Sequence, residues 1–286
     1  MTFTEKTVDV RGLNLTICEW GKENNSAPIV VLLHGFLDQG AAWHPVASQL
    51  SDAGYRVFAP DARGHGRSGH VSHGGNYHFP DYLSDLDSIV RQLGWGEFHL
   101  VGHSMGGSLA CMYSATRPES VLSLVLIEGV GPQFERPSEL TNKLITHLDQ
   151  LATPRPHRVM ESVELAARRM SKLNRGLSDT LALLLAKRAT IPVDGGFIWS
   201  WDPMHRNRLP ALFQRDSWLE LLKKIESPTS LIYGAQSPYI NLELSSRESA
   251  ISPTNVLTLD GGHCLHTEAP NAVAAEILRH IGESPL

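Results

Sequence analysis

The sequence has few cysteines, no excess of basic charge and no long hydrophobic run. Its three cysteines, Cys18, Cys111 and Cys264, show no Cys-x-x-Cys spacing, which argues against a disulfide framework and indicates a reducing compartment. The net charge of -5 provides no basic field for nucleic acid. No run of 18 apolar residues occurs, and charged residues stand where a secretory signal needs an apolar stretch. We therefore expect a cytoplasmic protein with no nucleic-acid or membrane partner; the sequence does not indicate its oligomeric state.

Short aliphatic runs alternate with longer amphipathic stretches in the first half of the chain. The apolar runs IVVLL and LVLI are typical of strands buried on both faces of a parallel sheet. Helices are predicted over 40–53, 80–93 and 104–117, and Pro118 ends the last of these. The predicted strands are 13–19, 29–33, 56–59, 97–101 and 121–127.

This alternation stops near residue 132. Helix patterns at 138–152, 157–174 and 178–190 follow, with no strand pattern. Strands are predicted again at 229–233 and 255–259, and a final helix over 268–281. The sequence therefore predicts one α/β core, formed by residues 1–131 and 217–286, and a helical insert at 132–216.

The sequence GHSMG stands at 102–106, between the apolar run FHLV and a helical stretch. In this context Gly-x-Ser-x-Gly predicts a sharp strand-to-helix turn that exposes the hydroxyl of Ser104 above the sheet. The start of the helix directs free N–H groups toward the same point, which favours a developing oxyanion. His103 precedes the serine, and we expect its side chain to point away from the hydroxyl.

Several further motifs follow one another in the chain. They are LHGFLDQGAAW, PDARGHGRS, YHFPDYLSDL, GHSMGG, LIEGVGP and GGHCLHTEAP. Together they resemble the motifs of the α/β-hydrolase superfamily over nearly the whole chain, in particular its serine-hydrolase-like branch. The resemblance implies an α/β-hydrolase fold, with a mostly parallel sheet, helices on both faces and a helical cap insert. It also implies a cofactor-free hydrolase with a small-molecule ester or acyl substrate.

The resemblance also implies a base and an oxyanion hole. His263, in the loop after the last predicted strand, matches the family's general base. The backbone N–H groups of Phe36 and Met105 match the oxyanion hole, and His34 is expected to brace that loop by hydrogen bonds. His266 is the competitor of His263, but we assign it to packing. A metal site at this His-x-x-His pair is disfavoured because no third ligand stands at useful spacing.

One absence bears directly on the mechanism. Many members of the family carry the third catalytic residue, a carboxylate, after the strand that matches TSLIY, yet no Asp or Glu occurs between Ser227 and Leu242. Ser237 occupies that position, and a hydroxyl cannot neutralise an imidazolium. The resemblance implies a second possible position for the acid, at the end of the strand that follows the nucleophile helix. Glu128 stands there, on the same edge of the sheet as Ser104, and is therefore our candidate acid. The alternative for Glu128 is a strand-end residue in an ion pair with the insert.

The insert is expected to select the substrate. Trp199 and Trp201, with His103 from the core, are candidates for the pocket wall, although an apolar underside also serves simply to pack a cap on a core. Asp61 and Arg63 are expected to form a buried network that fixes their own loop. The leading hypothesis is a serine esterase, a carboxylesterase-like enzyme. The alternatives are a thioesterase, lactonase or C–C bond hydrolase with the same residues, and a non-catalytic ligand-binding protein of this fold.

Overall fold

The computed structural model describes residues 3–21, 26–132, 134, 137–174, 176–207, 214–239 and 244–283. In this part of the chain, eight strands form one sheet in the order β1-β2-β4-β3-β5-β6-β9-β10. All neighbours from β4 to β10 are parallel, whereas β2 is antiparallel to both β1 and β4. The strands are β1 Thr4–Val10, β2 Leu13–Trp20, β3 Ile29–Leu33, β4 Arg56–Pro60, β5 Phe98–His103, β6 Val121–Ile127, β9 Thr229–Gly234 and β10 Asn255–Leu259.

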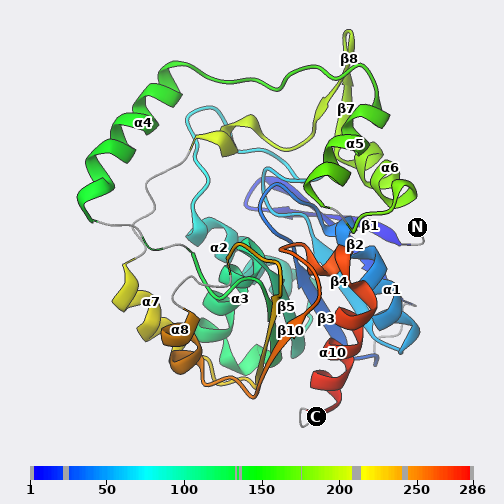
Figure 1. Cartoon of the computed structure of the whole chain (residues 1–286), viewed down its shortest axis with the longest axis vertical. Helices are drawn as coiled ribbons and strands as arrows, with labels where there is room; N and C mark the ends of the chain where they lie inside the picture. Colours follow the sequence, from blue (N-terminus) through cyan, green and yellow to red (C-terminus); the bar gives the residue numbers. More distant parts are fainter. Residues whose placement is uncertain are drawn as a thin grey trace.

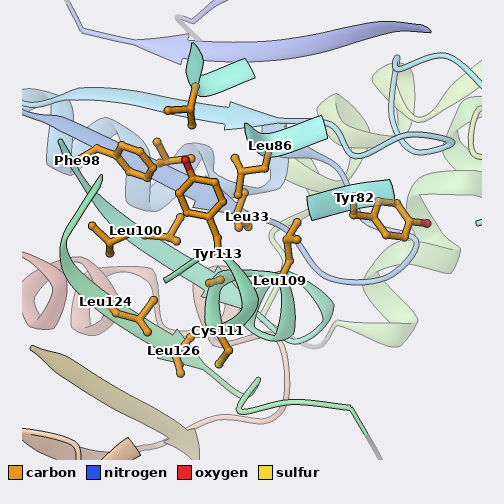
Figure 2. Packing of buried hydrophobic residues seen from close by; sticks show 14 of the residues in the cluster. Leu33, Tyr82, Leu86, Phe98, Leu100, Leu109, Cys111, Tyr113, Leu124 and Leu126 are labelled. Atoms are coloured by element: carbon orange, nitrogen blue, oxygen red, sulfur yellow. The ribbon is translucent and has the colours of Figure 1, made fainter. Parts of the chain in front are cut away.

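Helices cover both faces of this sheet (Figure 1). Alternate residues of β3 divide between two core clusters, Val31 and Leu33 in one and Val30 and Leu32 in the other, because successive strand side chains point to opposite faces. Figure 2 shows the first cluster, which includes Leu100, Leu109 and Tyr113. That face carries α2 Phe79–Leu93, α3 Met105–Thr116, α7 Arg215–Leu222 and α8 Leu244–Ile251, and the other carries α1 His44–Asp52, α9 Leu265–Glu268 and α10 Pro270–Glu283.

The strand register gathers the ends of five strands at one edge of the sheet. Leu33 pairs with Gly102, and His103 pairs with Ile127, so the chain after β3, β5 and β6 emerges side by side. Ile127 in turn pairs with Ile232 of β9, and β10 runs parallel beyond it. Parallel strands all present their carboxyl ends at the same edge, where open α/β sheets bind ligands. The loops with the candidate residues therefore converge there.

The segment between β6 and β9 carries α4 Leu140–Ala152, α5 Val163–Leu173 and α6 Asp179–Arg188. Helices α5 and α6 lie close together, whereas α4 stands apart from them on the other side of the view (Figure 1). The sequence predicts no strands in this segment. That prediction is wrong, because β7 Thr190–Val193 and β8 Gly196–Trp199 form an antiparallel hairpin. Its two-residue turn is Asp194–Gly195, a sequence that favours a tight hairpin turn. The predicted end of the insert at 216 falls inside α7, whose Trp218 and Leu222 belong to the core.

The predicted core strands and helices are confirmed, with shifts of a few residues at their ends, while β1 was missed. Each of two helices that the sequence predicts as continuous consists of two shorter helical segments in the structure. Residues 40–53 form a 3-10 turn, Gly40–Trp43, followed by α1, and the C-terminal helix is split into α9 and α10 before Pro270. Within the described residues, none of the helices has the length and apolar character needed to span a membrane.

Candidate active site

Ser104 sits on a strained turn between β5 and α3. Its φ of 53° and ψ of -114° are rare for a residue with a side chain, and such a conformation costs about 1–3 kcal/mol. The surrounding backbone is packed so closely that only glycine fits. A Cβ on Gly102 would lie 2.4 Å from the carbonyl oxygen of Gly106, and one on Gly106 would lie 2.3 Å from that of Leu33. The glycines of GHSMG thus allow the turn that exposes the hydroxyl.

An imidazole connects this hydroxyl to a carboxylate. His263 Nε2 lies 2.9 Å from Ser104 Oγ, and His263 Nδ1 lies 3.1 Å from Glu128 Oε2. The Glu128 side chain is 1% exposed and that of His263 is 27% exposed. The geometry suits a proton on Nδ1 and a lone pair on Nε2 toward the hydroxyl. A series of this kind is able to remove the hydroxyl proton and stabilise the resulting imidazolium.

The carboxylate of Glu128 is held from three sides. Its Oε1 accepts a 2.6 Å hydrogen bond from the backbone N–H of Gly234, and its Oε2 accepts one from the hydroxyl of Ser237 in addition to facing His263. Buried carboxylates are tolerated when hydrogen bonds satisfy both oxygens. Ser237, which occupies the position without an acid, therefore contacts the carboxylate that the neighbouring strand supplies.

The two residues whose amides are expected to hold an oxyanion belong to the segments that follow β3 and β5. Met105 is the first residue of α3, and Phe36 lies in the loop after β3, next to the elbow. His34 braces this loop: its Nδ1 donates to Gly35 O at 2.7 Å, and its Nε2 accepts from Ala62 N at 3.0 Å. These two hydrogen bonds agree with the expected role of His34, which is to hold the loop in place.

His103 lies below the hydroxyl rather than in the open site. It is 3% exposed, and its Nε2 donates to the backbone oxygen of His263 at 2.8 Å. Burial, followed by the nearby His266 and His263, lowers the pKa of His103 well below its usual value, so this imidazole stays neutral. The structure therefore places His103 under the loop of the base and away from the cavity described below.

One group of side chains in the described residues has the composition of a metal site. Asp38, His103 and His266 each offer a ligand atom within 4.8 Å of the others'. His266 already pairs with Asp38, since its Nε2 lies 3.2 Å from Asp38 Oδ2, and His103 bonds through its Nε2 to His263 O. We therefore treat the group as a polar cluster. His263 and His266 face different partners, because His263 Nε2 lies by Ser104 Oγ and His266 Nε2 by Asp38 Oδ2.

A cavity of about 170 Å³ opens between the core and the insert. Trp199 and Trp201 both lie on its wall, together with Leu37 and Asp38 from the loop that continues past Phe36. Its wall is mostly apolar, with Met170 and Leu173 contributed by α5. The cavity thus adjoins the expected oxyanion loop, whereas neither Ser104 nor His103 lines it.

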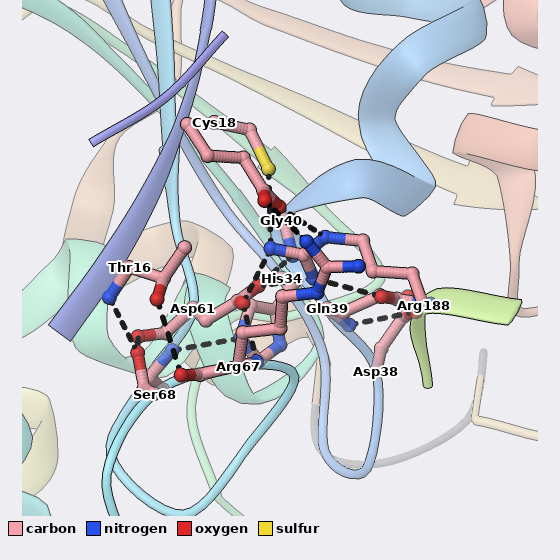
Figure 3. A network of polar contacts seen from close by, with 12 residues as sticks. Thr16, Cys18, His34, Asp38, Gln39, Gly40, Asp61, Arg67, Ser68 and Arg188 are labelled. Atoms are coloured by element: carbon pink, nitrogen blue, oxygen red, sulfur yellow. Dashed lines mark hydrogen bonds and ion pairs between the residues drawn. The ribbon is translucent and has the colours of Figure 1, made fainter. Parts of the chain in front are cut away.

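A buried ion pair joins the insert to the core. Arg188, at the end of α6, donates from Nη2 to Asp61 Oδ2 at 2.7 Å, and from Nη1 to Gln39 Oε1 at 2.8 Å (Figure 3). Asp61 also accepts from the backbone N–H of Gly40. Asp61 and Arg63 are both buried, as expected, but they belong to separate networks, because Arg63 makes two 2.6 Å bonds to Asp85 of α2. The partner of Asp61 was missed because it lies 127 residues away.

Removing this arginine should be costly. We expect Arg188→Met to lower the free energy of unfolding by about 3–5 kcal/mol, because it leaves the fully buried Asp61 carboxylate without its cation. Urea unfolding followed by circular dichroism measures the change. The control is Arg168→Met on the exposed side of α5, which should change stability by less than about 0.5 kcal/mol. Equal effects of the two substitutions would contradict this assignment.

The three cysteines are free, and Cys264 directly follows His263. Burial raises the pKa of the Cys264 thiol to about 12, and it also raises that of Cys111 to about 12. At pH 8 a thiol with this pKa is about 0.01% thiolate, and the thiolate is the reactive form. Cys264 therefore has the properties of an inert packing residue.

We accordingly expect iodoacetamide at pH 8 to leave Cys264 unmodified in the folded protein over an hour. Mass spectrometry of peptides measures the modification, and protein denatured before treatment provides the control, because all its cysteines should react. Rapid carbamidomethylation of Cys264 in the folded protein would show that its thiol is more acidic than its burial implies.

Comparison with known proteins decides the family. The chain matches the family model described as alpha/beta hydrolase fold over residues 28–186. The chain belongs to the α/β-hydrolase superfamily. This α/β hydrolase is 30% identical to a serine hydrolase-like protein of Danio rerio, covering 90% of this chain and 82% of that protein. It is 27% identical to human serine hydrolase-like protein 2, covering 90% and 87%.

Among solved structures, this α/β hydrolase is similar to a thioesterase domain from the curacin biosynthetic pathway. The two are 36% identical and superpose with a TM-score of 0.88, covering 97% of this chain and all of that domain. The comparisons thus place the chain with serine hydrolase-like proteins and extend the α/β-hydrolase fold over nearly its whole length.

Proposed function

We propose that this hydrolase is a serine esterase that cleaves carboxylic esters of small, mostly apolar molecules through an acyl-enzyme intermediate. The observation that carries the proposal is the hydrogen-bonded series from Ser104 through His263 to Glu128. A bare Gly-x-Ser-x-Gly is common in turns, but a serine on a strained turn within 2.9 Å of an imidazole that faces a buried carboxylate is the arrangement of an activated nucleophile.

The proposed reaction has two halves. Ser104 Oγ attacks the acyl carbon while its proton passes to His263 Nε2, and Glu128 stabilises the imidazolium. The amides of Phe36 and Met105 bind the tetrahedral oxyanion, after which the imidazolium protonates the leaving alcohol. In the second half, His263 takes a proton from water as its oxygen attacks the acyl carbon of the Ser104 ester. The imidazolium then returns that proton to Ser104 Oγ as the acyl carbon–Oγ bond breaks and the acid leaves. No cofactor or metal takes part.

The cavity beside the oxyanion loop is the proposed site for the apolar part of the substrate. Its tryptophans come from the insert, so we propose that residues 132 to about 214 form a cap that selects the substrate and that α7 belongs to the core. A volume of about 170 Å³ with mostly apolar walls suits a modest acyl or alkyl group rather than a charged polymer. We also propose a cytoplasmic location, on the evidence of three unpaired cysteines.

A thioester substrate is the second candidate, favoured by the 36% identity to a thioesterase domain. The residues around Ser104 serve either reaction, because both form the same acyl-enzyme. The test compares oxygen esters and N-acetylcysteamine thioesters of the same acyl groups, from two to ten carbons, with Ser104→Ala as the control. A higher kcat/KM for the oxygen esters supports the esterase, and a consistent preference for the thioesters supports the thioesterase.

A non-catalytic protein of this fold is the hypothesis from another class. A fluorophosphonate probe discriminates it, because phosphonylation requires an activated serine and no particular ester substrate. We expect stoichiometric labelling at Ser104. If the probe fails to label the folded protein, the catalytic proposal is wrong.

A further inference from the structure

Asp38, His266 and His103 form a polar cluster that joins three segments of the candidate site: the loop after β3, the short helix α9 that follows His263, and the end of β5. Asp38 lies two residues after Phe36, His266 three residues after His263, and His103 directly before the nucleophile. His266 is 1% exposed and faces Asp38 Oδ2 at 3.2 Å, and its ring packs on those of His103 and Trp43 at centroid distances of 4.4 and 4.8 Å. Phe36, Ser104 and His263 therefore each have a residue of this cluster close to them in the sequence.

The oxyanion loop needs such an anchor because its backbone is strained. Leu37, directly after Phe36, has a φ of 59°, which costs a branched residue roughly 1–2 kcal/mol. The start of the loop is fixed by His34, whose ring bonds to Gly35 O and Ala62 N. Its far end carries Asp38, whose N–H donates to Gly35 O at 3.2 Å, closing the turn that contains Phe36.

The contact between Asp38 and His266 ties this turn to the loop of the base. The Arg188 network holds the following residues, Gln39 and Gly40, against the insert and β4, but it makes no contact with the loop of His263. In the described residues, Asp38–His266 is the hydrogen bond between side chains that spans the two loops. His103 completes the connection, because its Nε2 holds the carbonyl of His263 itself.

We propose that Asp38 and His266 are positioning residues that set the separation between the Phe36 amide and the imidazole of His263. The inference rests on the proposed serine-hydrolase function, since the position of the amide matters only where an oxyanion forms. An oxyanion donor acts at about 2.7–3.1 Å from the charge, and a displacement near 1 Å can cost on the order of 100-fold in rate. Without the contact to His266, the Asp38 end of the loop would be free to move, and the Phe36 amide could be displaced by such a distance.

The test uses two substitutions of His266 in the full chain. His266→Phe keeps an aromatic ring against Trp43 but removes the Nε2 donor, whereas His266→Gln retains an N–H donor near the same place. The control is His99→Phe, because His99 is also a buried histidine with a side-chain partner, Ser123 Oγ at 2.8 Å, but lies at the opposite end of β5. Fluorophosphonate labelling, ester hydrolysis and thermal unfolding are measured for each.

We expect His266→Phe to lower kcat and the second-order labelling rate by roughly 10- to 100-fold. KM should stay within about threefold, because the lost contact acts on the transition state and not on substrate binding. His266→Gln should recover most of the rate. His99→Phe should keep the parent's rate even where its melting temperature falls as far as that of His266→Phe.

A substitution of the other partner keeps the test informative if His266→Phe does not fold. The side chain of Asp38 is partly exposed, so Asp38→Ala should fold. It should lower the labelling rate by the same factor as His266→Phe, and the double variant should be no slower than either single variant, because both remove one interaction.

The measurements distinguish a failure of the positioning role from a failure of the proposed function. Parent-like labelling of His266→Phe or Asp38→Ala, or equal losses in His266→Phe and His99→Phe, would show that the cluster only packs, while the proposed function would stand. A parent protein that the probe does not label would contradict the proposed function, and the positioning role would fall with it.

Discussion

Ser104→Ala should abolish ester hydrolysis, with a fall in kcat of about 10⁵- to 10⁶-fold for the best substrate in the panel. The reason is that no other hydroxyl is bonded to His263 Nε2 among the described residues. Without the nucleophile, only binding and the oxyanion amides remain, and these leave a small residual acceleration over water. The measurement is release of p-nitrophenol by purified protein over a range of enzyme concentrations.

Ser108→Ala provides a matched control. Ser108 lies four residues further along α3 and is buried, but it is not in the series that contains His263. It should retain hydrolysis within about threefold, since a buried hydroxyl removed away from the chemistry changes mainly stability. Hydrolysis by Ser104→Ala at the rate of the parent would exclude the proposed mechanism.

Glu128→Gln should lower kcat on the order of 10³-fold. The amide has nearly the shape of the carboxylate but carries no charge to stabilise the imidazolium, and its NH₂ group opposes the N–H on His263 Nδ1. KM should change little, because Glu128 is buried behind the imidazole and away from the cavity. Steady-state kinetics with the same ester gives both constants.

Ser237→Ala separates the carboxylate from its hydrogen-bond donor. Ser237 shares Oε2 of Glu128 with His263, while Gly234 N–H continues to hold Oε1. Loss of the hydroxyl should therefore lower kcat by less than about tenfold, which corresponds to one hydrogen bond. If Ser237→Ala proved more damaging than Glu128→Gln, Glu128 would not be the acid.

The sequence predicts the fold well where the physical signal is local. Fully apolar runs such as IVVLL indicated the buried parallel strands, and the position of GHSMG between a strand and a helix indicated the elbow at Ser104. Glu128 was proposed as the acid because the resemblance implies such a position and because it follows the strand beside β5; the pairing of His103 with Ile127 places it beside Ser104. Each of these inferences depends on residues close together in sequence or on neighbouring strands.

Contacts between distant segments could not be predicted in the same way. Nothing near Arg188 shows that its guanidinium reaches Asp61, or that His266 meets Asp38 across 228 residues, because insert geometry and loop packing determine both. Such pairs leave no periodic pattern. The β7–β8 hairpin is a different case, since Asp194–Gly195 was a readable turn signal in a segment otherwise dominated by helix patterns.

The absence of an acid after β9 has a simple structural counterpart. Ser237 and the N–H of Gly234 occupy that loop, and both donate to Glu128, so the loop supports a carboxylate that comes from the adjacent strand. The loop after β9, where many members of the family carry the acid, thus supplies two hydrogen-bond donors to Glu128. The site thereby keeps one buried negative charge beside His263, which is the number the proposed mechanism requires.

The central claim is that Ser104 becomes acylated during turnover. Its most direct test is rapid quenching of the protein with a p-nitrophenyl ester, followed by mass spectrometry of the peptide that contains residue 104. The ester's good leaving group should make hydrolysis of the acyl-enzyme rate-limiting, so we predict the mass of one acyl group on Ser104 and a matching burst of p-nitrophenol. Turnover with no adduct, or with the acyl group on another residue, would contradict the account.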